Sequence, residues 1–288
     1  MRKGSAMPRT TKSSRRRDSL HRNQATKTVG ELQRLCPGFE SIEAATKFDS
    51  TMVRRLQKLK AQENSELVST LKCALESEHP TNAASHLATT LFRARLANAL
   101  IKFSSSHHEQ PVQAVAIPSN IQLAPEDITK RDLVRMKGRF KKRLERCGLG
   151  DRIVIAAIDY SLNEHSEDAW RSYWQPHLTI WVFGASPKQV HDLLKKQFSA
   201  TSHNTQRPVR CDEIKPAEIP RTATYLLKAR YSRRVKLRQK RLRTSNFALT
   251  PYDNKLLPLL RALAGIEVRD RLILIGCRFD GNNITPTA

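Results

Sequence analysis

Three side chains in the second half of the sequence could together act on a phosphodiester. His177 lies in an apolar stretch, Trp174–Gly184, and a neutral imidazole is a good ligand for a divalent cation. Tyr225 and Lys228 are three residues apart, which puts them on one face if the segment is helical. A phenol is a weak nucleophile at neutral pH and needs a nearby cation. The predicted chemistry is attack of Tyr225 on a phosphodiester, with a free 3′-OH as the leaving group.

The strand predicted for Gln175–Phe183 has two chemically different faces. Side chains alternate across a strand, so His177 and Thr179 share one face with Trp181. The opposite, core-facing set consists of Leu178, Ile180 and Val182. We therefore expect His177 and Thr179 on an open face of the sheet, although an isolated strand histidine is more often structural than a ligand.

Acidic residues of the preceding predicted strand (152–164) would complete a cation site. A connecting loop centred near residue 169 would bring Ser161 opposite His177 and Asp159 opposite Thr179 in an antiparallel pair. A carboxylate beside a histidine suits Mg²⁺ or Mn²⁺. The alternative is that Asp159 is a hydrogen-bonded polar residue without a ligand role. The predicted metal ligands are His177, Thr179, Asp159 and Glu164.

The charge of the chain points to a polyanionic partner. The sequence has 288 residues with 51 Lys and Arg against 27 Asp and Glu, a formal net charge of +24. Such an excess favours DNA or RNA over the alternatives, an anionic membrane surface or a ribosomal or structural role. No amphipathic membrane helix or lipidation motif accompanies the charge.

The basic residues are densest just after Tyr225. Nine of the sixteen residues from 228 to 243 are Lys or Arg, a density that predicts contacts with the phosphate backbone. Tyr231, within this run, is expected to be a stacking or backup residue. The predicted DNA-binding side chains are Arg230, Arg233, Arg234, Lys236, Arg238, Lys240 and Arg241.

The chain divides into four parts by composition and periodicity. Residues 1–27 are basic with few large apolar side chains, which predicts a disordered tail. Residues 28–105 carry apolar residues at helical spacing, and a cap at Thr26 or Thr28 is expected at their start. Their basic outer face is expected to be solvated, or alternatively to dock on DNA. Residues 111–235 form the predicted catalytic domain, and 236–288 a basic segment followed by a helix and a strand that pack on the core.

The central part predicts an α+β fold. Strands are expected over 112–118, 152–164, 175–183 and 208–214. Helices are expected over 126–146, from Ser186-Pro187 onward, and over 216–234. The first six of these elements follow the order of a ferredoxin-like antiparallel sheet with two helices on one face. The other face would be left for a ligand.

Cysteine usage and hydropathy bear on the compartment. The five cysteines are scattered without a CxxC or CxxH pair, which excludes an ordinary zinc finger and fits reduced thiols. The sequence shows no secretory signal and no apolar run of the length a membrane span needs. We expect a bacterial cytoplasmic protein associated with the nucleoid.

Three stretches resemble motifs of one enzyme family in order along the chain. Val112–Pro118 resembles a first strand motif, Pro176–Trp181 a metal-binding motif, and Ala223–Ala229 a Tyr-x-x-Lys nucleophile motif. The family is the HUH (His-hydrophobic-His) endonucleases, specifically the rolling-circle replication initiators of plasmids and phages. The resemblance covers about residues 111–235, and Thr179 stands where the family usually has its second histidine.

The resemblance implies initiation of DNA replication by site-specific single-strand nicking. Tyr225 would form a covalent 5′-phosphotyrosine link with Lys228 beside it, and Mg²⁺ or Mn²⁺ would be the cofactor. The implied partners are a single-stranded or hairpin DNA origin and a host replication helicase or polymerase, with a homodimer left open and no membrane. Two alternatives remain: a nonenzymatic nucleic-acid-binding protein on the same fold, and a transposase with the same chemistry.

Overall fold

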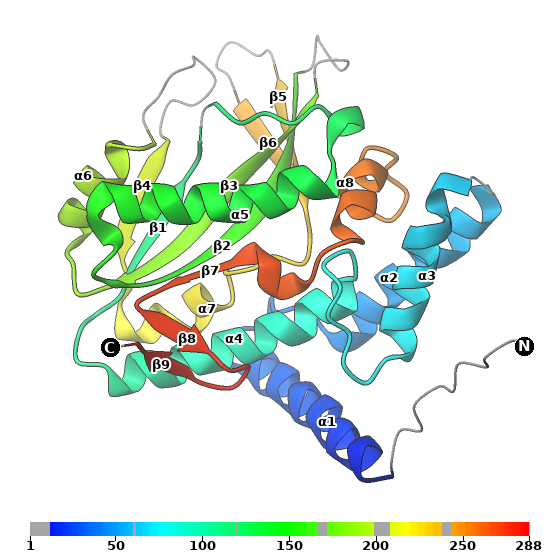
Figure 1. The fold of residues 1–288 in the computed structure, drawn as a ribbon, viewed down its shortest axis with the longest axis horizontal. Helices are drawn as coiled ribbons and strands as arrows, with labels where there is room; N and C mark the ends of the chain where they lie inside the picture. The colour runs from blue at the N-terminus through cyan, green and yellow to red at the C-terminus, as the bar shows by residue number, and fades with distance from the viewer. Residues whose placement is uncertain are drawn as a thin grey trace, which may run out of the picture.

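The protein has an α+β architecture built around one mixed β-sheet. The computed structural model describes residues 12–59, 62–118, 120–165, 172–198, 208–237 and 243–287. Within these residues it has eight α-helices and a sheet of seven strands. Figure 1 shows how the helices are arranged around the sheet. The prediction of an α+β fold is confirmed.

The strands of the sheet run in the order β4-β1-β3-β2-β5-β6, and β7 pairs with β2 beside β5. Strand β2 is parallel to β5, whereas its pairing with β3 and β7 is antiparallel. The sheet is therefore mixed and wider than the predicted four strands. The strand bounds are β1 Val112–Ala116, β2 Ile153–His165, β3 Tyr173–Phe183, β4 Val209–Glu213, β5 Ser232–Leu237, β6 Arg243–Ala248 and β7 Leu272–Ile275.

Two helices cover one face of the sheet, as the apolar periodicity predicts. They are α5 (Lys130–Leu144) and α6 (Pro187–Lys195). Helix α6 starts with the predicted Ser186 cap, whose hydroxyl accepts from the Gln189 N–H in a capping box. The inner side chains of both helices pack on the apolar side chains of β3, namely Leu178, Ile180 and Val182.

The opposite face is also covered, so the prediction of an open face is wrong over much of the sheet. Trp181 and Phe183 of β3 are buried there in a second core with the long helix α4 (His86–Ser106). The apolar spacing in α4 requires such a partner, because its Ala and Leu side chains are buried almost all round. The residual opening lies next to β3, beside the short helix α7 (Ile219–Ala223).

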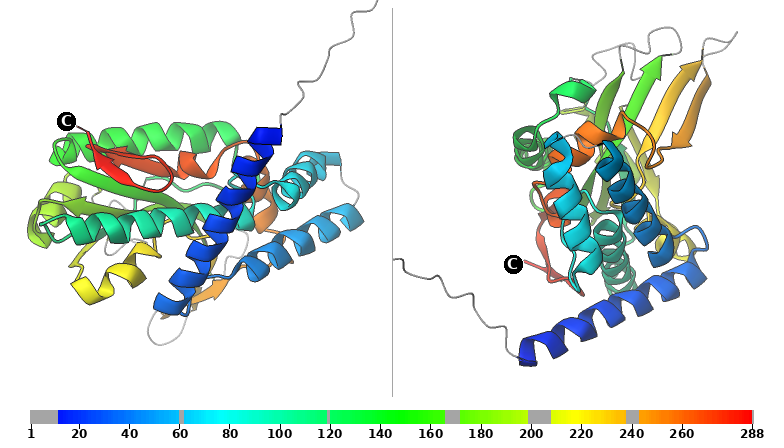
Figure 2. Two further views of the ribbon diagram at one scale, coloured as in Figure 1. Left: turned by 90° about the horizontal axis from the view of Figure 1, so that it is seen from below. Right: turned by 90° about the vertical axis from the view of Figure 1, so that its right-hand side faces the viewer.

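The N-terminal helical region packs on α4. Its helices are α1 (Lys12–Leu35), α2 (Ile42–Leu59) and α3 (Ser65–Glu76), and Figure 2 shows α1 crossing α4. Helix α1 begins well before the predicted boundary at residue 28. Of the tail expected to be disordered, residues 12–27 are therefore helical, and residues 1–11 lie outside the described chain. Thr28 is not a cap, because its hydroxyl donates to the Gln24 carbonyl inside the helix.

A buried carboxylate joins α2 to α4. Asp49 accepts from the backbone N–H groups of His86 and Leu87 and from the Ser85 hydroxyl, at 2.7 to 3.1 Å. The two N–H groups belong to the first turn of α4 and have no acceptor within the helix, so a negative charge is a favourable partner for them. The His86 ring stacks on Phe48, with centroids 3.6 Å apart. The described residues offer neither ring nitrogen of His86 a hydrogen-bond partner.

The helix predicted for residues 216–234 is much shorter. Helix α7 ends at Ala223, and the chain then turns through Leu227, which has a left-handed φ of 56°. A branched aliphatic residue in that region is strained and cannot continue a right-handed helix. The basic run that follows forms β5 instead of a helix. Tyr225 and Lys228 therefore lie in a loop between α7 and β5.

The C-terminal segment ends in a helix, a strand and a two-stranded hairpin. Helix α8 (Leu256–Leu263) and β7 pack on the core. Strands β8 (Cys277–Phe279) and β9 (Ile284–Pro286) then form a hairpin, anchored by the buried side chain of Ile284. Across the residues described, no helix has both the length and the apolar composition needed to cross a membrane.

Candidate functional site

A hollow of about 630 Å³ opens on the face of the sheet that α4 covers only in part. His177 and Thr179 of β3 lie in its wall together with Tyr225 and Lys228 of the following loop. The structure thus brings together the predicted nucleophile, the predicted lysine and the predicted strand histidine. Five basic side chains line the same hollow, namely Arg210, Lys215, Arg221, Lys228 and Arg234, against the acidic Asp212, Glu213 and Glu218.

His177 is held as a neutral imidazole. Its side chain is 5% exposed, and burial lowers its pKa to about 4 even though Asp159 acts in the opposite direction. Within the described chain, Nδ1 of His177 has no hydrogen-bond partner. The ring is therefore uncharged at neutral pH, and one nitrogen is unused.

The register between β2 and β3 differs from the predicted one by two residues. Asp159 pairs directly with His177, and Ser161 pairs with Gln175. Asp159 still reaches Thr179, whose hydroxyl donates to Oδ2 over a long 3.5 Å.

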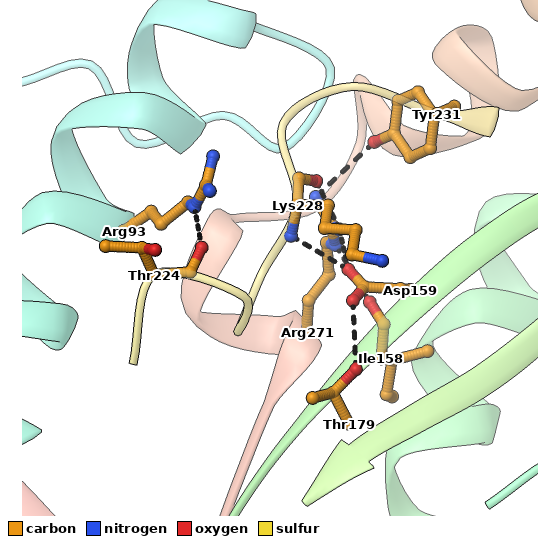
Figure 3. A network of polar contacts seen from close by, with 8 residues as sticks. All are labelled: Arg93, Ile158, Asp159, Thr179, Thr224, Lys228, Tyr231 and Arg271. Carbon is orange, nitrogen blue, oxygen red and sulfur yellow. Dashed lines mark hydrogen bonds and ion pairs between the residues drawn. The ribbon is translucent and has the colours of Figure 1, made fainter. Parts of the chain in front are cut away.

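Asp159 forms a buried ion pair with Arg271, which Figure 3 shows at the centre of a polar network. The Nη2 of Arg271 is 2.9 Å from Oδ1 of Asp159, and both side chains are at most 3% exposed. Arg271 also donates to the carbonyl of Ile158 at 3.1 Å and to the hydroxyl of Tyr231 at 3.4 Å. Burial alone would lower the pKa of Arg271, but Tyr231, Asp159 and Tyr160 outweigh it and raise that pKa. A buried pair satisfied by this many hydrogen bonds fixes its surroundings.

The same ion pair holds the loop that carries Tyr225. The N–H of Lys228 donates to Oδ1 of Asp159 at 3.0 Å, and the carbonyl of Lys228 accepts from Nη2 of Arg271 at 3.1 Å. At the start of the loop, Arg93 of α4 donates to the carbonyl of Thr224 at 2.7 Å. Figure 3 shows both anchors. The segment 224–228 is thus fixed at both ends by guanidinium groups, which offsets the strain at Leu227.

Tyr225 and Lys228 are presented to solvent next to each other. Tyr225 is 45% exposed, and Nζ of Lys228 is 5.1 Å from the centre of its ring. Both residues also line a second hollow of about 700 Å³, beside the connection between α1 and α2. Tyr225 therefore lies between two hollows. Tyr231, expected as a stacking or backup residue, is instead 3% exposed and packs edge-on against Trp174 in the core.

Glu164 does not join the other predicted ligands. It lies an odd number of positions from Asp159 along β2, so its side chain is on the opposite face of the sheet. There it is buried in an ion pair with Arg233 and Lys255 and accepts from Ser172 at 3.3 Å. Burial would raise its pKa, but these two cations outweigh burial and lower it. Glu164 therefore neutralises basic side chains far from His177.

The predicted ligand set does not fit a Mg²⁺ or Mn²⁺ site. The unused Nδ1 of His177 suits one coordination position, but these ions prefer several oxygen ligands. Among the four predicted ligands, Asp159 is the one carboxylate that lies beside His177. Its charge is already balanced by the guanidinium of Arg271. In the part of the chain described, no three His, Cys, Asp or Glu side chains form a metal-binding group. A dication at Asp159 would have to approach a buried positive charge.

The predicted DNA-binding residues are only partly gathered at the site. Arg234 lines the hollow of His177, and burial lowers its pKa. Arg230 borders the second hollow, where it forms an ion pair with buried Glu40 at 2.7 Å. Arg233 is turned to Glu164 on the other face. Lys236 lies on β5, and three predicted contacts, Arg238, Lys240 and Arg241, lie outside the described residues.

The sequence prediction did not include Arg271, Arg93 or Arg221, although each borders or builds the site. Arg271 precedes the apolar strand β7, and Arg93 lies in the alanine- and leucine-rich α4. A charged residue beside or within an apolar element is a sign of a buried partner, because an unpaired buried charge is costly. The sequence contains such a charged residue both at the start of β7, Arg271, and within α4, Arg93. Nothing in the sequence indicated which carboxylate or carbonyl would be the partner.

Comparisons with known proteins give no independent identification. No protein-family model, no curated protein and no solved structure matches this chain.

Proposed function

We propose that this chain is a tyrosine-dependent single-strand DNA endonuclease that initiates replication of a mobile element. The observation that carries the proposal is the fixed loop that presents Tyr225 and Lys228 at the mouth of a basic hollow with His177 in its wall. A nucleophile held by buried ion pairs meets the requirement for a precisely positioned reacting group. Transposition by the same chemistry is the other outcome that this site supports.

The fold adds support to this proposal. The order β4-β1-β3-β2, with α5 and α6 on one face, is the order of a ferredoxin-like sheet. We propose that residues 111–235 form a nuclease domain of that kind, extended by β5, β6 and β7. The hollow lies on the face that this arrangement leaves for a ligand.

The proposed reaction is a transesterification. The Tyr225 oxygen attacks the phosphorus, the bond from phosphorus to the 3′ oxygen breaks, and that oxygen leaves as a hydroxyl with a proton from solvent. The phenolic proton passes to solvent, and a 5′-phosphotyrosine link remains. The two hollows beside Tyr225 leave room for nucleotides on both sides of the scissile phosphate.

Charge neutralisation in this proposal comes from side chains of the chain itself. Lys228, Arg221 and Arg234 line the hollow, and fixed cations at a transferring phosphoryl group stabilise its developing charge. His177 is neutral and contributes a hydrogen-bonding nitrogen rather than a charge. No step is assigned to a metal, because Arg271 already pairs with Asp159, the carboxylate beside His177.

A covalent adduct is the direct test of the reaction. Single-stranded oligonucleotides of random sequence, labelled at the 3′ end, should give a labelled protein band that survives denaturation. Tyr225→Phe should abolish the band and Tyr252→Phe should not, because Tyr252 is 70% exposed away from the hollow. The band should form in EDTA as well as with Mn²⁺. A band that requires Mn²⁺ would instead support the metal prediction and remove the role assigned to the basic side chains.

A nonenzymatic nucleic-acid-binding protein is the second candidate. It is favoured by the engagement of Asp159 with Arg271, which leaves His177 without a free carboxylate beside it. In that case no adduct forms, while Tyr225→Phe and the unmodified chain bind single-stranded DNA equally. The two candidates therefore differ in the covalent step and not in binding.

A further inference from the structure

Helix α5 carries a row of exposed cations that the proposed reaction does not use. Its inner face packs Leu133, Met136 and Phe140 into the core, and in Figure 1 the helix lies across the near face of the sheet. The outer row is spaced by four, four, three and four residues. It consists of Arg131, Arg135, Arg139, Lys142 and Arg146, all exposed.

The spacing places these side chains along one line. At 3.6 residues per turn, the five positions fall within about 80° around the helix axis. The four on α5 extend over about 17 Å at 1.5 Å per residue, and Arg146 follows in the π-helical turn Glu145–Leu149. Among the described residues, none of the five forms an ion pair, whereas Lys137 and Lys141 beside the row pair with Asp270 and Glu145. The row is therefore a line of uncompensated positive charge.

A second observation is the surface between these side chains. Gly138 lies beside the row in mid-helix, and an added Cβ there would meet no atom within 4 Å. Glycine inside an exposed helix costs about 1 kcal/mol relative to alanine. No packing contact accounts for it. Its effect is to leave a shallow gap between Arg135 and Lys142, where another backbone can approach α5 closely.

We propose that this row, the α5 basic row, binds the phosphate backbone of double-stranded DNA. A duplex presents a phosphate about every 3.4 Å along each strand, so about 17 Å of helix spans about five phosphates of one strand. The row lies on the sheet face opposite His177 and Tyr225, since α5 packs on the side of β3 that faces away from the hollow. The duplex would lie there while a single strand occupies the hollow. The identification of the ligand as DNA rests on the proposed function. The arrangement of the positive charges on α5 is independent of that function.

Duplex binding can be tested without the covalent reaction. In a Tyr225→Phe background, Arg135→Gln, Arg139→Gln and Lys142→Gln are combined, and anisotropy of a labelled 20-base-pair duplex is measured over a salt series. The control combines Lys58→Gln, Lys72→Gln and Lys102→Gln, three exposed lysines on α2, α3 and α4. Both variants lose three charges, so they differ only in where the charge is removed.

We expect the α5 variant to lose at least about tenfold in duplex affinity, and its dependence of log K on log salt to flatten by about 3, since each lost phosphate contact accounts for about 0.9. The control should change far less. Equal losses of duplex affinity in both variants would mean that only the net charge of the protein matters, and would overturn the proposal. Unchanged duplex affinity, with loss of binding to vesicles of phosphatidylglycerol, would overturn it in favour of a membrane surface. If the chain with Tyr225 intact forms no adduct, the proposed function fails, but the duplex-binding measurement still tests the α5 basic row.

Discussion

Removal of the Arg271 charge should both destabilise the protein and disorganise the loop of Tyr225. Arg271→Met keeps most of the side-chain length but leaves the Asp159 carboxylate buried without its cation. Breaking a buried pair from one side typically costs about 3–5 kcal/mol. The carbonyls of Ile158 and Lys228 lose their donor at the same time. Against a total stability of about 5–15 kcal/mol for a native protein, the variant should show a large drop in urea midpoint.

A paired replacement separates stability from positioning. Asp159→Leu combined with Arg271→Met removes both charges, and such apolar replacements are often close to neutral. We expect the double variant to be more stable than Arg271→Met alone. It should still fail to form the DNA adduct, because neither side chain remains to hold the N–H and the carbonyl of Lys228. Arg278→Met, at an exposed position on β8, is the matched control and should change stability by less than about 0.5 kcal/mol.

The outcome that refutes this reasoning is specific. One such outcome is a loss of less than about 1 kcal/mol in the free energy of unfolding of Arg271→Met. The other is a double variant that is less stable than the single one. Either result would mean that the ion pair does not organise the site. Retention of adduct formation by a folded double variant would mean that the loop is positioned by other contacts.

Two further predictions concern Lys228 and the buried histidines. Lys228→Met should slow adduct formation by about a hundredfold, as expected for loss of a preorganised charge, in a gel time course with Lys188→Met, an exposed position on α6 outside the hollows, as control; equal rates for the two variants would exclude a role for Lys228. Burial lowers the pKa of His86 to about 3 and of His177 to about 4, from 6.5. Their stabilisation is therefore complete above pH 6.5 and is lost as the pH falls toward those values. Buried Asp49, whose pKa is raised to about 6, acts in the opposite direction, with stabilisation present at low pH and lost as the pH rises through about 6. In melting curves recorded between about pH 7.5 and 4.5, His86→Phe should flatten the acid decrease in Tm, and an unchanged profile would contradict this assignment.

The fold was predictable where apolar periodicity alone determines an element. Strand β3 and helices α5 and α6 follow from alternation, helical spacing and the Ser186 cap. The cover on the second sheet face was not predictable in this way. Trp181 was expected beside His177 on an open face, and only the packing of α4 shows that Trp181 and Phe183 are buried.

The residues assigned to the proposed chemistry could be predicted from the sequence, but the contacts that position them could not. Tyr225, Lys228 and His177 line one hollow, although the helix that was expected to align the first two ends at Ala223. Local propensity favoured that helix, and the long-range bond from the Lys228 N–H to Asp159 favours the loop. Contacts between residues 69 and 112 positions apart leave no periodic trace in a sequence. For the same reason the partner of Asp159 could not be inferred.

Mass spectrometry of the chain after incubation with single-stranded DNA tests the central claim most directly. The proposal predicts that nuclease and protease digestion yields a peptide in which Tyr225 carries a 5′-linked nucleotide. The same digest of Tyr225→Phe should contain no nucleotide-linked peptide. A nucleotide linked to another residue, or an intact chain without any linked nucleotide while DNA is bound, would contradict the assignment of Tyr225 as the nucleophile.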